Sequence, residues 1–259
     1  MEIQLSGVDH GAGFDFGRTA AQYARFRDIY PPELYDRLYA LGVGRPGTGW
    51  LDVGTGTGVL PLHLYERGAQ CVGADISAEQ IEEAKALAAE RNAPIRFLAC
   101  AAESLPFADG TFDAVTAAQC FWYFDREKIV REIRRILKPG GVFVKVYMNW
   151  SLTDPIARAS CRLVKRLNPS WTSGATAYRD VYDHPFPGGK VEVFTADIPF
   201  TRETWHGRMC ACRGTMASMD ADTLRVWDER HRRLLLKYPK TFTVRHRIYI
   251  ASYTMIEVN

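Results

Sequence analysis

The sequence lacks the features that would place the protein in a membrane or outside the cell. No apolar run in its 259 residues approaches the roughly 20 residues that a bilayer crossing needs. Residues 1–16 lack the basic block and the apolar block of a secretion signal. We therefore expect a cytoplasmic protein without a membrane partner.

Paired cysteines are also missing. The six cysteines are scattered through segments with core or helix patterns, and none of them forms a C-x-x-C pair. Cys210 and Cys212 form a single C-x-C, but without a second ligand pair this spacing predicts packing rather than a metal site. We therefore expect reduced thiols and no bound metal.

A strong excess of charge of one sign is absent too. The 33 basic and 30 acidic residues give a net charge of +3, which is too mild to imply a polyanion partner and argues against nucleic acid. Two local basic clusters, at residues 230–233 and 245–247, lie beside helical and strand-like apolar patterns. We interpret both clusters as solvated faces of these elements.

What the sequence does contain is a regular alternation of short apolar runs with amphipathic segments. This alternation begins near Gly49 and predicts a parallel sheet with helices on both faces. Strands are expected at residues 50–53, 70–75, 95–99, 112–118 and 142–147, with helices at 59–67, 77–91 and 127–137. The last of these helices is expected to stop at Pro139, Gly140 and Gly141.

After Trp150 the alternation breaks. Residues 152–176 have the pattern of a helix followed by a polar loop, which we interpret as an insertion. Further strands are expected at residues 191–198 and 241–256, and further helices at 201–219 and 221–237. The expected fold class is α/β, a Rossmann-like doubly wound sheet of seven mostly parallel strands with a helical insertion after the fifth strand.

The segment L-D-V-G-T-G-T-G at residues 51–58 carries most information about function. Glycines at alternate positions after a buried strand permit a sharp bend and remove Cβ atoms from the path of a ligand. Open parallel sheets bind ligands beyond the carboxyl ends of their strands, where this bend lies. A dinucleotide fingerprint is the main alternative, but its sixth position is Val59, which is too large for close helix packing.

Asp75 ends the second expected strand about 20 residues after the glycine-rich bend, where a carboxylate can accept hydrogen bonds from ribose hydroxyls. A helix N-cap is the alternative role for this aspartate. Ser77 already supplies that cap, with Gln80 three residues later. We therefore expect Asp75 to bind a ligand.

Four stretches together resemble the class I S-adenosylmethionine-dependent methyltransferase family, in its small-molecule, type 11-like branch. They are L-D-V-G-T-G-T-G at 51–58, G-A-D-I-S at 73–77, A-E-S-L-P-F-A-D-G-T-F-D at 102–113 and L-K-P-G-G at 137–141. The likeness covers about residues 14–147. It implies a methyltransferase that uses S-adenosyl-L-methionine and acts on a small-molecule acceptor.

The resemblance also implies roles for individual residues in binding the cofactor. Asp52 and the backbone of Gly54, Thr55, Gly56 and Gly58 would contact the methionine part. Asp75 would hold the ribose, Ile76 would flank the adenine, and Ala102 with Glu103 would lie at the adenine edge. Gln119, at the end of the fourth strand, would hold the methionine end or position the acceptor.

The resemblance also extends to N-terminal helices that close over the cofactor as a lid. Tyr23 and Arg27 are candidates for this lid, with surface packing as the alternative.

We expect one domain in four parts. These are N-terminal lid helices at 14–42, a cofactor-binding core at 48–150, an insertion or cap at 151–190, and C-terminal strands and helices at 191–259. Because S-adenosylmethionine carries an already activated methyl group, such a protein mainly has to align the acceptor and exclude water. A general base is optional.

Three residues are candidates for handling the acceptor. Residues 118–125 resemble a family segment that often reads A-Q-A-F-H-W-F-D, and here Trp122 replaces the histidine. This change removes a possible base and leaves an aromatic wall for a flat or cationic acceptor, although core packing is an equal alternative. His206 could act as a base or as a structural hydrogen-bonding group. Arg208 could clamp an acceptor carboxylate or form a surface ion pair.

The sequence therefore predicts a small-molecule methyltransferase that works by in-line displacement. Two other classes stay open. One is a methyltransferase of RNA or protein, which the basic clusters suggest and which salt-sensitive RNA binding would support. The other is a protein that binds S-adenosylmethionine without catalysis. The acceptor, the methylated atom and the oligomeric state are not determined by the sequence, because this fold hosts many acceptors.

Overall fold

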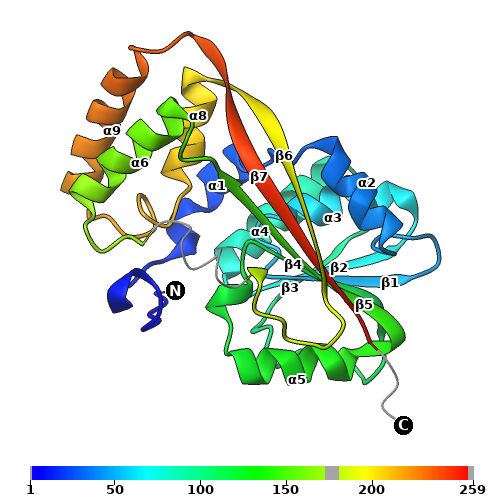
Figure 1. Ribbon diagram of the computed structural model, residues 1–259. Coiled ribbons are helices and arrows are strands. Elements are labelled where there is room, and N and C mark those ends of the chain that lie inside the picture. Colours follow the sequence, from blue (N-terminus) through cyan, green and yellow to red (C-terminus); the bar gives the residue numbers. More distant parts are fainter. Residues whose placement is uncertain (1, 173–180, 256–259) are drawn as a thin grey trace. The chain divides into compact units, whose positions relative to one another are not determined.

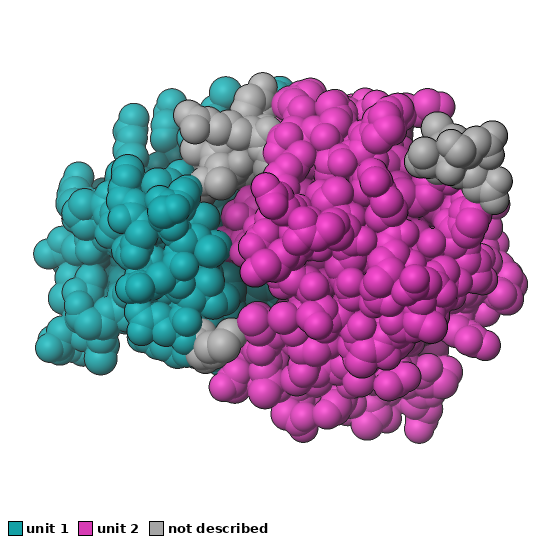
Figure 2. All heavy atoms as spheres, turned by 90° about the horizontal axis from the view of Figure 1, so that it is seen from below, with its two compact units in different colours: residues 1–29, 148–176, 194–248 teal, residues 30–147, 177–193, 249–259 magenta. Residues whose placement is uncertain are grey.

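The computed structural model describes residues 2–172 and 181–255, and the chain divides into two compact units. Unit 1 comprises residues 1–29, 148–176 and 194–248, and unit 2 comprises residues 30–147, 177–193 and 249–259 (Figure 2). The expected N-terminal lid helices are thus divided between the units after Ile29. Residues 173–180, within the expected insertion, and residues 256–259 lie outside the described part.

Unit 2 contains the parallel part of a seven-stranded sheet (Figure 1). Its strands are β1 (Gly49–Val53), β2 (Gln70–Asp75), β3 (Arg96–Ala99), β4 (Phe112–Ala118) and the first part of β5 (Leu137–Trp150). Leu51 of β1 aligns with Val72 of β2 on one side and with Val115 of β4 on the other, and both pairings are parallel. The strand order in the whole sheet is β3-β2-β1-β4-β5-β7-β6.

Three long strands, β5, β6 (Lys190–Thr201) and β7 (Thr241–Thr254), each contribute residues to both units. The N–H of Gly140 donates to the carbonyl of Met255, and the N–H of Ser151 donates to the carbonyl of Arg245. Residue numbers therefore rise along one strand while those of the hydrogen-bonded partners fall, which means that β7 runs antiparallel to β5. The expected seven-stranded, mostly parallel, Rossmann-like sheet is confirmed.

Helices cover both faces of the sheet in unit 2. The helix α5 (Arg126–Ile136) buries Ile129, Ile133 and Ile136 in one core cluster with the central strands. The helices α3 (Val59–Leu64) and α4 (Ala78–Glu90) contribute to a separate cluster with Phe97 of β3. This two-sided cover explains why the central strands are almost continuously apolar. Unit 2 also contains α2 (Pro32–Ala40), which has a proline at its first position.

The end of α5 differs from the expectation. Its last residue is Ile136, and Pro139, Gly140 and Gly141 lie inside β5 instead of forming the stop of the helix. The sheet takes over directly because Leu137 already pairs with Phe112 of β4, and an irregularity between Phe112 and Ala114 absorbs the extra residues. The apolar pattern of residues 142–147 revealed only the central part of this strand.

Unit 1 is mainly helical, with α1 (Ala20–Phe26), α6 (Pro155–Leu167), α8 (Arg202–Cys210) and α9 (Ala221–Leu235). The helix expected over residues 201–219 is wrong beyond Cys210, where the chain turns. Two contacts, one of them with a residue distant in sequence, favour the turns. The Thr215 hydroxyl donates to the Met209 carbonyl at 2.6 Å, and a Cβ at Gly214 would fall 2.6 Å from the ring of Trp171. Neither contact is visible in the local sequence pattern.

None of the helices in the described part of the chain combines the length and the apolar character that a membrane crossing needs.

Candidate functional site

The glycine-rich bend after β1 has the left-handed backbone that its sequence suggests. The φ angles of Gly54, Gly56 and Gly58 are +64°, +58° and +78°, a region that favours glycine. A Cβ at Gly54 would fall 2.6 Å from the Cys120 sulfur, and a Cβ at Gly58 would fall 2.7 Å from the Phe97 ring. This corrects part of the expectation, because at these two positions the space freed by glycine is filled by protein side chains and not left for a ligand.

Asp75, at the carboxyl end of β2, holds this bend in place. Its Oδ2 accepts a hydrogen bond from the Gly56 N–H, and its Oδ1 accepts one from the Ser77 N–H, both at 2.9 Å. Burial raises the pKa of this carboxyl, and the backbone N–H groups partly oppose the rise. Ser77 does cap α4, as expected, by accepting from the Gln80 N–H. An ionised carboxylate has about four acceptor positions, so Asp75 keeps capacity for ligand hydroxyls.

Asp52 is the second buried carboxyl at the end of β1. The Thr116 hydroxyl donates to its Oδ1 at 2.6 Å and itself accepts from the indole N–H of Trp50 at 3.0 Å. Burial raises the pKa of Asp52 to about 7, although the hydrogen bond from Thr116 lowers it in part. This carboxyl is therefore close to its midpoint at neutral pH, where a nearby cation would shift it to the charged form.

The segment after β4 is held in an unusual conformation. Gln119 has a φ of +62° although it is not a glycine, and its N–H donates to the Val146 carbonyl at 2.9 Å. Next to it, the Cys120 thiol donates to the carbonyl of Val53 at 3.1 Å, which fixes this segment against the end of β1. Such strain persists only where the surroundings impose it, and it is common at functional sites.

The expected adenine-binding residues lie at the ends of neighbouring strands. The Ile76 side chain follows β2 and is 48% exposed, which is unusual for a large apolar residue in this unit. Ala102 is buried, and the Glu103 carboxylate accepts a hydrogen bond from the Asp125 N–H at 2.9 Å. The N–H of Cys100 donates to the Asp75 carbonyl at 2.9 Å, so this segment is tied to the end of β2.

Trp122 stacks on Tyr147, the centroids of their rings lying 5.4 Å apart with an interplanar angle of 26°. Among the described residues, neither the indole Nε1 of Trp122 nor the hydroxyl of Tyr147 has a hydrogen-bond partner, although both atoms are buried. Buried polar atoms are normally satisfied. This pair therefore combines an aromatic surface with two polar atoms that a ligand could satisfy. Trp122 also packs against the main core, so its two expected roles are compatible.

The sequence reasoning missed Lys145, which is fully buried in β5. Its ammonium donates to the Asp183 carbonyl at 2.9 Å and lies 4.9 Å from the centre of the Phe121 ring and 5.7 Å from that of Tyr147. A lysine inside a continuous apolar strand was the available signal, because lysine is almost never fully buried without a partner.

In unit 1, Arg208 is a buried cation, and no carboxylate of the described residues pairs with it. Its guanidinium lies 4.9 Å from the centre of the Trp150 ring and donates to the Cys212 sulfur at 3.1 Å, while its Nε has no partner within the described residues. Burial lowers the pKa of Arg208 to about 10, and the positive charge of Arg27 contributes. Arg27 donates to the hydroxyl of Tyr23 at 3.2 Å. The expected surface ion pair of Arg208 is thus wrong.

His206 is also buried in unit 1, and both of its ring nitrogens contact protein groups. Nδ1 lies 2.8 Å from Nδ1 of His231, and Nε2 lies 2.8 Å from Oδ1 of Asp228. Burial lowers the pKa of His206, while Asp228 partly opposes this effect. Neither nitrogen is free to act as a base in this arrangement.

The basic clusters seen in the sequence are divided by the structure. In the first, His231 is buried and the Arg232 guanidinium donates to Asp228 at 2.9 Å. In the second, His246 is buried and Arg245 pairs with Asp197. The arginines of both clusters are exposed, as expected for solvated faces, whereas the two histidines are buried, which corrects that interpretation for His231 and His246.

Comparison with known proteins gives a consistent picture for the central segment. Residues 51–145 match the family model of a methyltransferase domain. The demethylmenaquinone methyltransferase of Thermus thermophilus is 48% identical over 97 residues, which cover 36% of this chain and 44% of that protein. The uncharacterized methyltransferase Mb3374 of Mycobacterium bovis is 34% identical over 139 residues, which cover 54% of this chain and 53% of that protein.

A solved structure extends the likeness beyond this segment. The crystal structure of YcgJ from Bacillus subtilis aligns with a TM-score of 0.54 and 23% identity, covering 87% of this chain and 98% of that one. This level of identity shows a shared fold. The chain spans only about half the length of the curated relatives that it matches in sequence.

Proposed function

We propose that this chain is a class I S-adenosylmethionine-dependent methyltransferase, and that it transfers a methyl group to a small-molecule acceptor by in-line displacement. Its residues 51–145 match the family model of a methyltransferase domain, and the relatives that it matches over this segment are methyltransferases. The observation that carries this proposal is the bend after β1, held by the Asp75 carboxylate at the carboxyl ends of β1 and β2. Open parallel sheets bind nucleotides beyond the carboxyl ends of their strands, which is where this bend lies. S-adenosylmethionine would supply the activated methyl group when bound.

The residues around the bend fit this cofactor chemically. Asp75 has acceptor capacity for the ribose hydroxyls, and the exposed Ile76 next to it offers an apolar surface for the adenine. Asp52 offers a carboxyl whose pKa, at about 7, would let it become an anion beside the cationic methionine end. We assign the backbone of Gly54, Thr55, Gly56 and Gly58 to the methionine part, Ala102 and Glu103 to the adenine edge, and Gln119 to the methionine end. Tyr23 and Arg27 remain predictions as lid residues.

For the acceptor, we propose a flat molecule. The stacked Trp122 and Tyr147 of unit 2 offer a ring surface with two polar atoms that have no partner among the described residues. That Arg208 clamps an acceptor carboxylate remains a prediction; its guanidinium is buried in unit 1 and has no carboxylate partner among the described residues. Catalysis by His206 as a base remains a prediction, which its contacts with His231 and Asp228 disfavour.

The proposed activity is tested by methyl transfer from labelled S-adenosylmethionine to a panel of flat aromatic acids and to their neutral analogues. We expect S-adenosylhomocysteine to form with the acids, with the product carrying the label. Transfer to RNA in a salt-sensitive manner would favour the nucleic-acid alternative. Tight cofactor binding without turnover on any acceptor would favour a protein that binds the cofactor without catalysis.

The pH dependence of cofactor binding should report on Asp52. Because burial raises its pKa from 3.8 to about 7, Asp52 is mostly protonated at pH 6 and mostly charged at pH 8. If the charged form binds the methionine ammonium, the affinity should rise about tenfold between these pH values, since one pKa unit corresponds to a factor of ten. Calorimetric titration at pH 6, 7 and 8 measures this rise.

The matched variant Asp52→Asn separates this effect from titration of the ligand itself. It should bind S-adenosylmethionine more weakly, and its affinity should no longer rise tenfold between pH 6 and 8. An identical pH profile in wild type and variant would remove Asp52 from the methionine site.

The raised pKa of Asp52 also affects stability. The cofactor-free protein should lose the stabilising contribution of the protonated Asp52 as the pH rises towards 7.

A further inference from the structure

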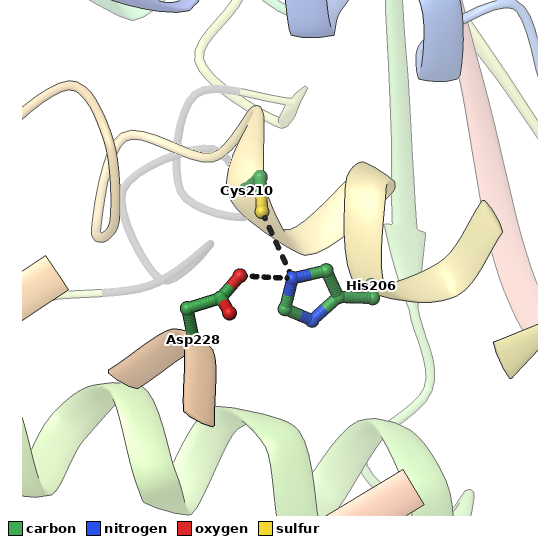
Figure 3. A group of neighbouring side chains, drawn as sticks. All are labelled: His206, Cys210 and Asp228. Carbon is green, nitrogen blue, oxygen red and sulfur yellow. Dashed lines mark hydrogen bonds and ion pairs between the residues drawn. The ribbon is translucent and has the colours of Figure 1, made fainter. Parts of the chain in front are cut away.

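Three potential metal ligands in unit 1 converge on one point (Figure 3). The Nε2 atom of His206 lies 2.8 Å from Oδ1 of Asp228 and 3.5 Å from the sulfur of Cys210. The three ligand atoms all lie within 4.8 Å of one another. A ring nitrogen carries either one hydrogen or one lone pair, so Nε2 cannot serve the carboxylate and the thiol fully at the same time.

This geometry excludes a nucleophile–base–acid relay. In such a relay the thiol and the carboxylate approach opposite nitrogens of the imidazole, so that one orients the base while the other loses its proton to it. Here Cys210 and Asp228 approach the same nitrogen. A cation bound between these atoms would instead stabilise the arrangement, because the carboxylate, the sulfur and the lone pair of Nε2 could all bind to it.

Two helices supply the ligands. His206 and Cys210 are four residues apart on α8, so their side chains project from the same face of the helix. Asp228 projects from α9, and its second oxygen accepts from the Arg232 guanidinium at 2.9 Å, which orients the carboxylate. The thiol of the neighbouring Cys212 contacts Arg208 and does not take part.

The other nitrogen of His206 has the outer partners that a metal-bound histidine needs. Nδ1 contacts Nδ1 of His231 at 2.8 Å, Nε2 of His231 contacts the Ser160 hydroxyl at 3.0 Å, and this hydroxyl can donate to the Ile156 carbonyl at 2.9 Å. In one arrangement, Nδ1–H of His206 donates to Nδ1 of His231, Nε2–H of His231 donates to the Ser160 hydroxyl, and this hydroxyl donates to the Ile156 carbonyl. Nε2 of His206 then carries no hydrogen and keeps its lone pair for a metal ion. Hydrogen bonds of this kind fix the tautomer of metal-binding histidines.

We propose that His206, Cys210 and Asp228 bind a zinc ion, with water as a fourth ligand. Bond lengths of about 2.0–2.3 Å in a tetrahedron place nitrogen and sulfur about 3.6 Å apart and nitrogen and oxygen about 3.3 Å apart. The sulfur already lies at a fitting distance from the nitrogen, 3.5 Å. The carboxylate oxygen lies 2.8 Å from the nitrogen and within 4.8 Å of the sulfur, so it has to move by about 1 Å, away from the nitrogen and towards the sulfur, before all three atoms can share one tetrahedral ion. The Asp228 side chain is 38% exposed, so both this shift and a water ligand are feasible.

The donor set selects the class of metal. Nitrogen, sulfur and oxygen ligands together suit zinc and similar transition metals, whereas magnesium and calcium take oxygen ligands. Binding converts the Cys210 thiol to a thiolate, and its proton leaves to solvent. None of the three ligands belongs to the residues assigned to S-adenosylmethionine, so zinc binding and cofactor binding can fail independently.

The experiment titrates the chelator-treated full chain with Zn²⁺ alone by calorimetry and with Co²⁺ by absorption spectroscopy. We expect one equivalent of zinc to bind, and the cobalt form to show a thiolate-to-metal charge-transfer band. Cys210→Ala should lower the zinc affinity by at least about 100-fold, since a direct ligand is worth no less than its outer partners, and should remove the band. The matched control Cys212→Ala, which deletes a thiol two residues away, should change neither.

Asp228→Asn provides a second variant, because it keeps the shape of the side chain and an oxygen that can accept from Arg232. It should lower the zinc affinity while keeping the charge-transfer band. Circular dichroism verifies that each variant is folded. Absence of stoichiometric zinc binding in the wild type, or equal zinc affinity in the wild type, Cys210→Ala and Asp228→Asn, would show that the cluster is only a structural hydrogen-bond network.

Discussion

Replacing Asp75 with alanine is expected to weaken the binding of S-adenosylmethionine by at least about 100-fold, because hydrogen bonds to a charged group contribute about 1.5–3 kcal/mol each and two ribose hydroxyls would lose theirs. The change would also release the Gly56 and Ser77 N–H groups, which both donate to this carboxylate at 2.9 Å. Cofactor contacts and the shape of the bend would thus be lost together. Calorimetric titration with S-adenosylmethionine measures the effect.

A matched control for this variant is Asp109→Ala in the same unit. The Asp109 side chain is 82% exposed and pairs with Arg135, so its loss should leave cofactor affinity unchanged. Asp75→Asn gives a second test, because an amide can accept from one of the two N–H groups but faces the other with a donor. Wild-type affinity in folded Asp75→Ala would refute the assignment of Asp75 to the ribose.

The second large effect is expected on stability, from the buried ion pair between Asp9 and Arg213 in unit 1. The pair is bidentate, with distances of 2.7 and 2.9 Å, and the two side chains are only 3% and 7% exposed. The Asp9 carboxylate also accepts from the N–H and the hydroxyl of Thr172. Asp9→Ala deletes the carboxylate that compensates the buried charge of Arg213, and breaking a buried ion pair in this way costs about 3–5 kcal/mol. The melting temperature should fall by at least about 6 °C.

Arg245 and Asp197 form the natural control pair. Their ion pair is also bidentate, with distances of 2.9 and 3.0 Å, but the side chains are 61% and 48% exposed. Exposed pairs contribute about 0–1 kcal/mol, so Asp197→Ala should shift the melting temperature by much less than Asp9→Ala. The double variant Asp9→Ala, Arg213→Met should be less destabilised than Asp9→Ala alone, because no buried charge remains. Equal shifts for the two aspartate variants would contradict the role of burial.

Local sequence patterns predicted the sheet well but not its irregular ends. The strands and helices between residues 49 and 136 follow from periodicity and capping, which depend on neighbours in the sequence. The turns at residues 211–219 do not, because they depend on contacts with Trp171 and with the Asp9 carboxylate, which are distant in sequence. The start of β5 at Leu137 likewise depends on its partner Phe112.

In the candidate site, too, the sequence predicted the features that depend on neighbouring residues but not the contacts between distant ones. The order of the motifs identified the bend and Asp75, but it did not predict which groups they contact. The sequence assigned the helix cap to Ser77 and a ligand to Asp75, but it did not predict that the Asp75 carboxylate also accepts from the N–H groups of Gly56 and Ser77. It gave Arg208 a surface ion pair as its alternative role, whereas the side chain is buried and no carboxylate of the described residues pairs with it.

By itself, the sequence determined the class of fold and carried a resemblance to a methyltransferase family, because glycine spacing and apolar periodicity depend only on residues that are close together in the sequence. Only the tertiary structure decided which polar groups meet. His206 and Cys210 come from one helix and Asp228 from another, and their convergence depends on how these helices pack. Side chains that are distant in sequence acquire a common function only when packing brings their atoms within bonding distance, and no local pattern encodes that distance.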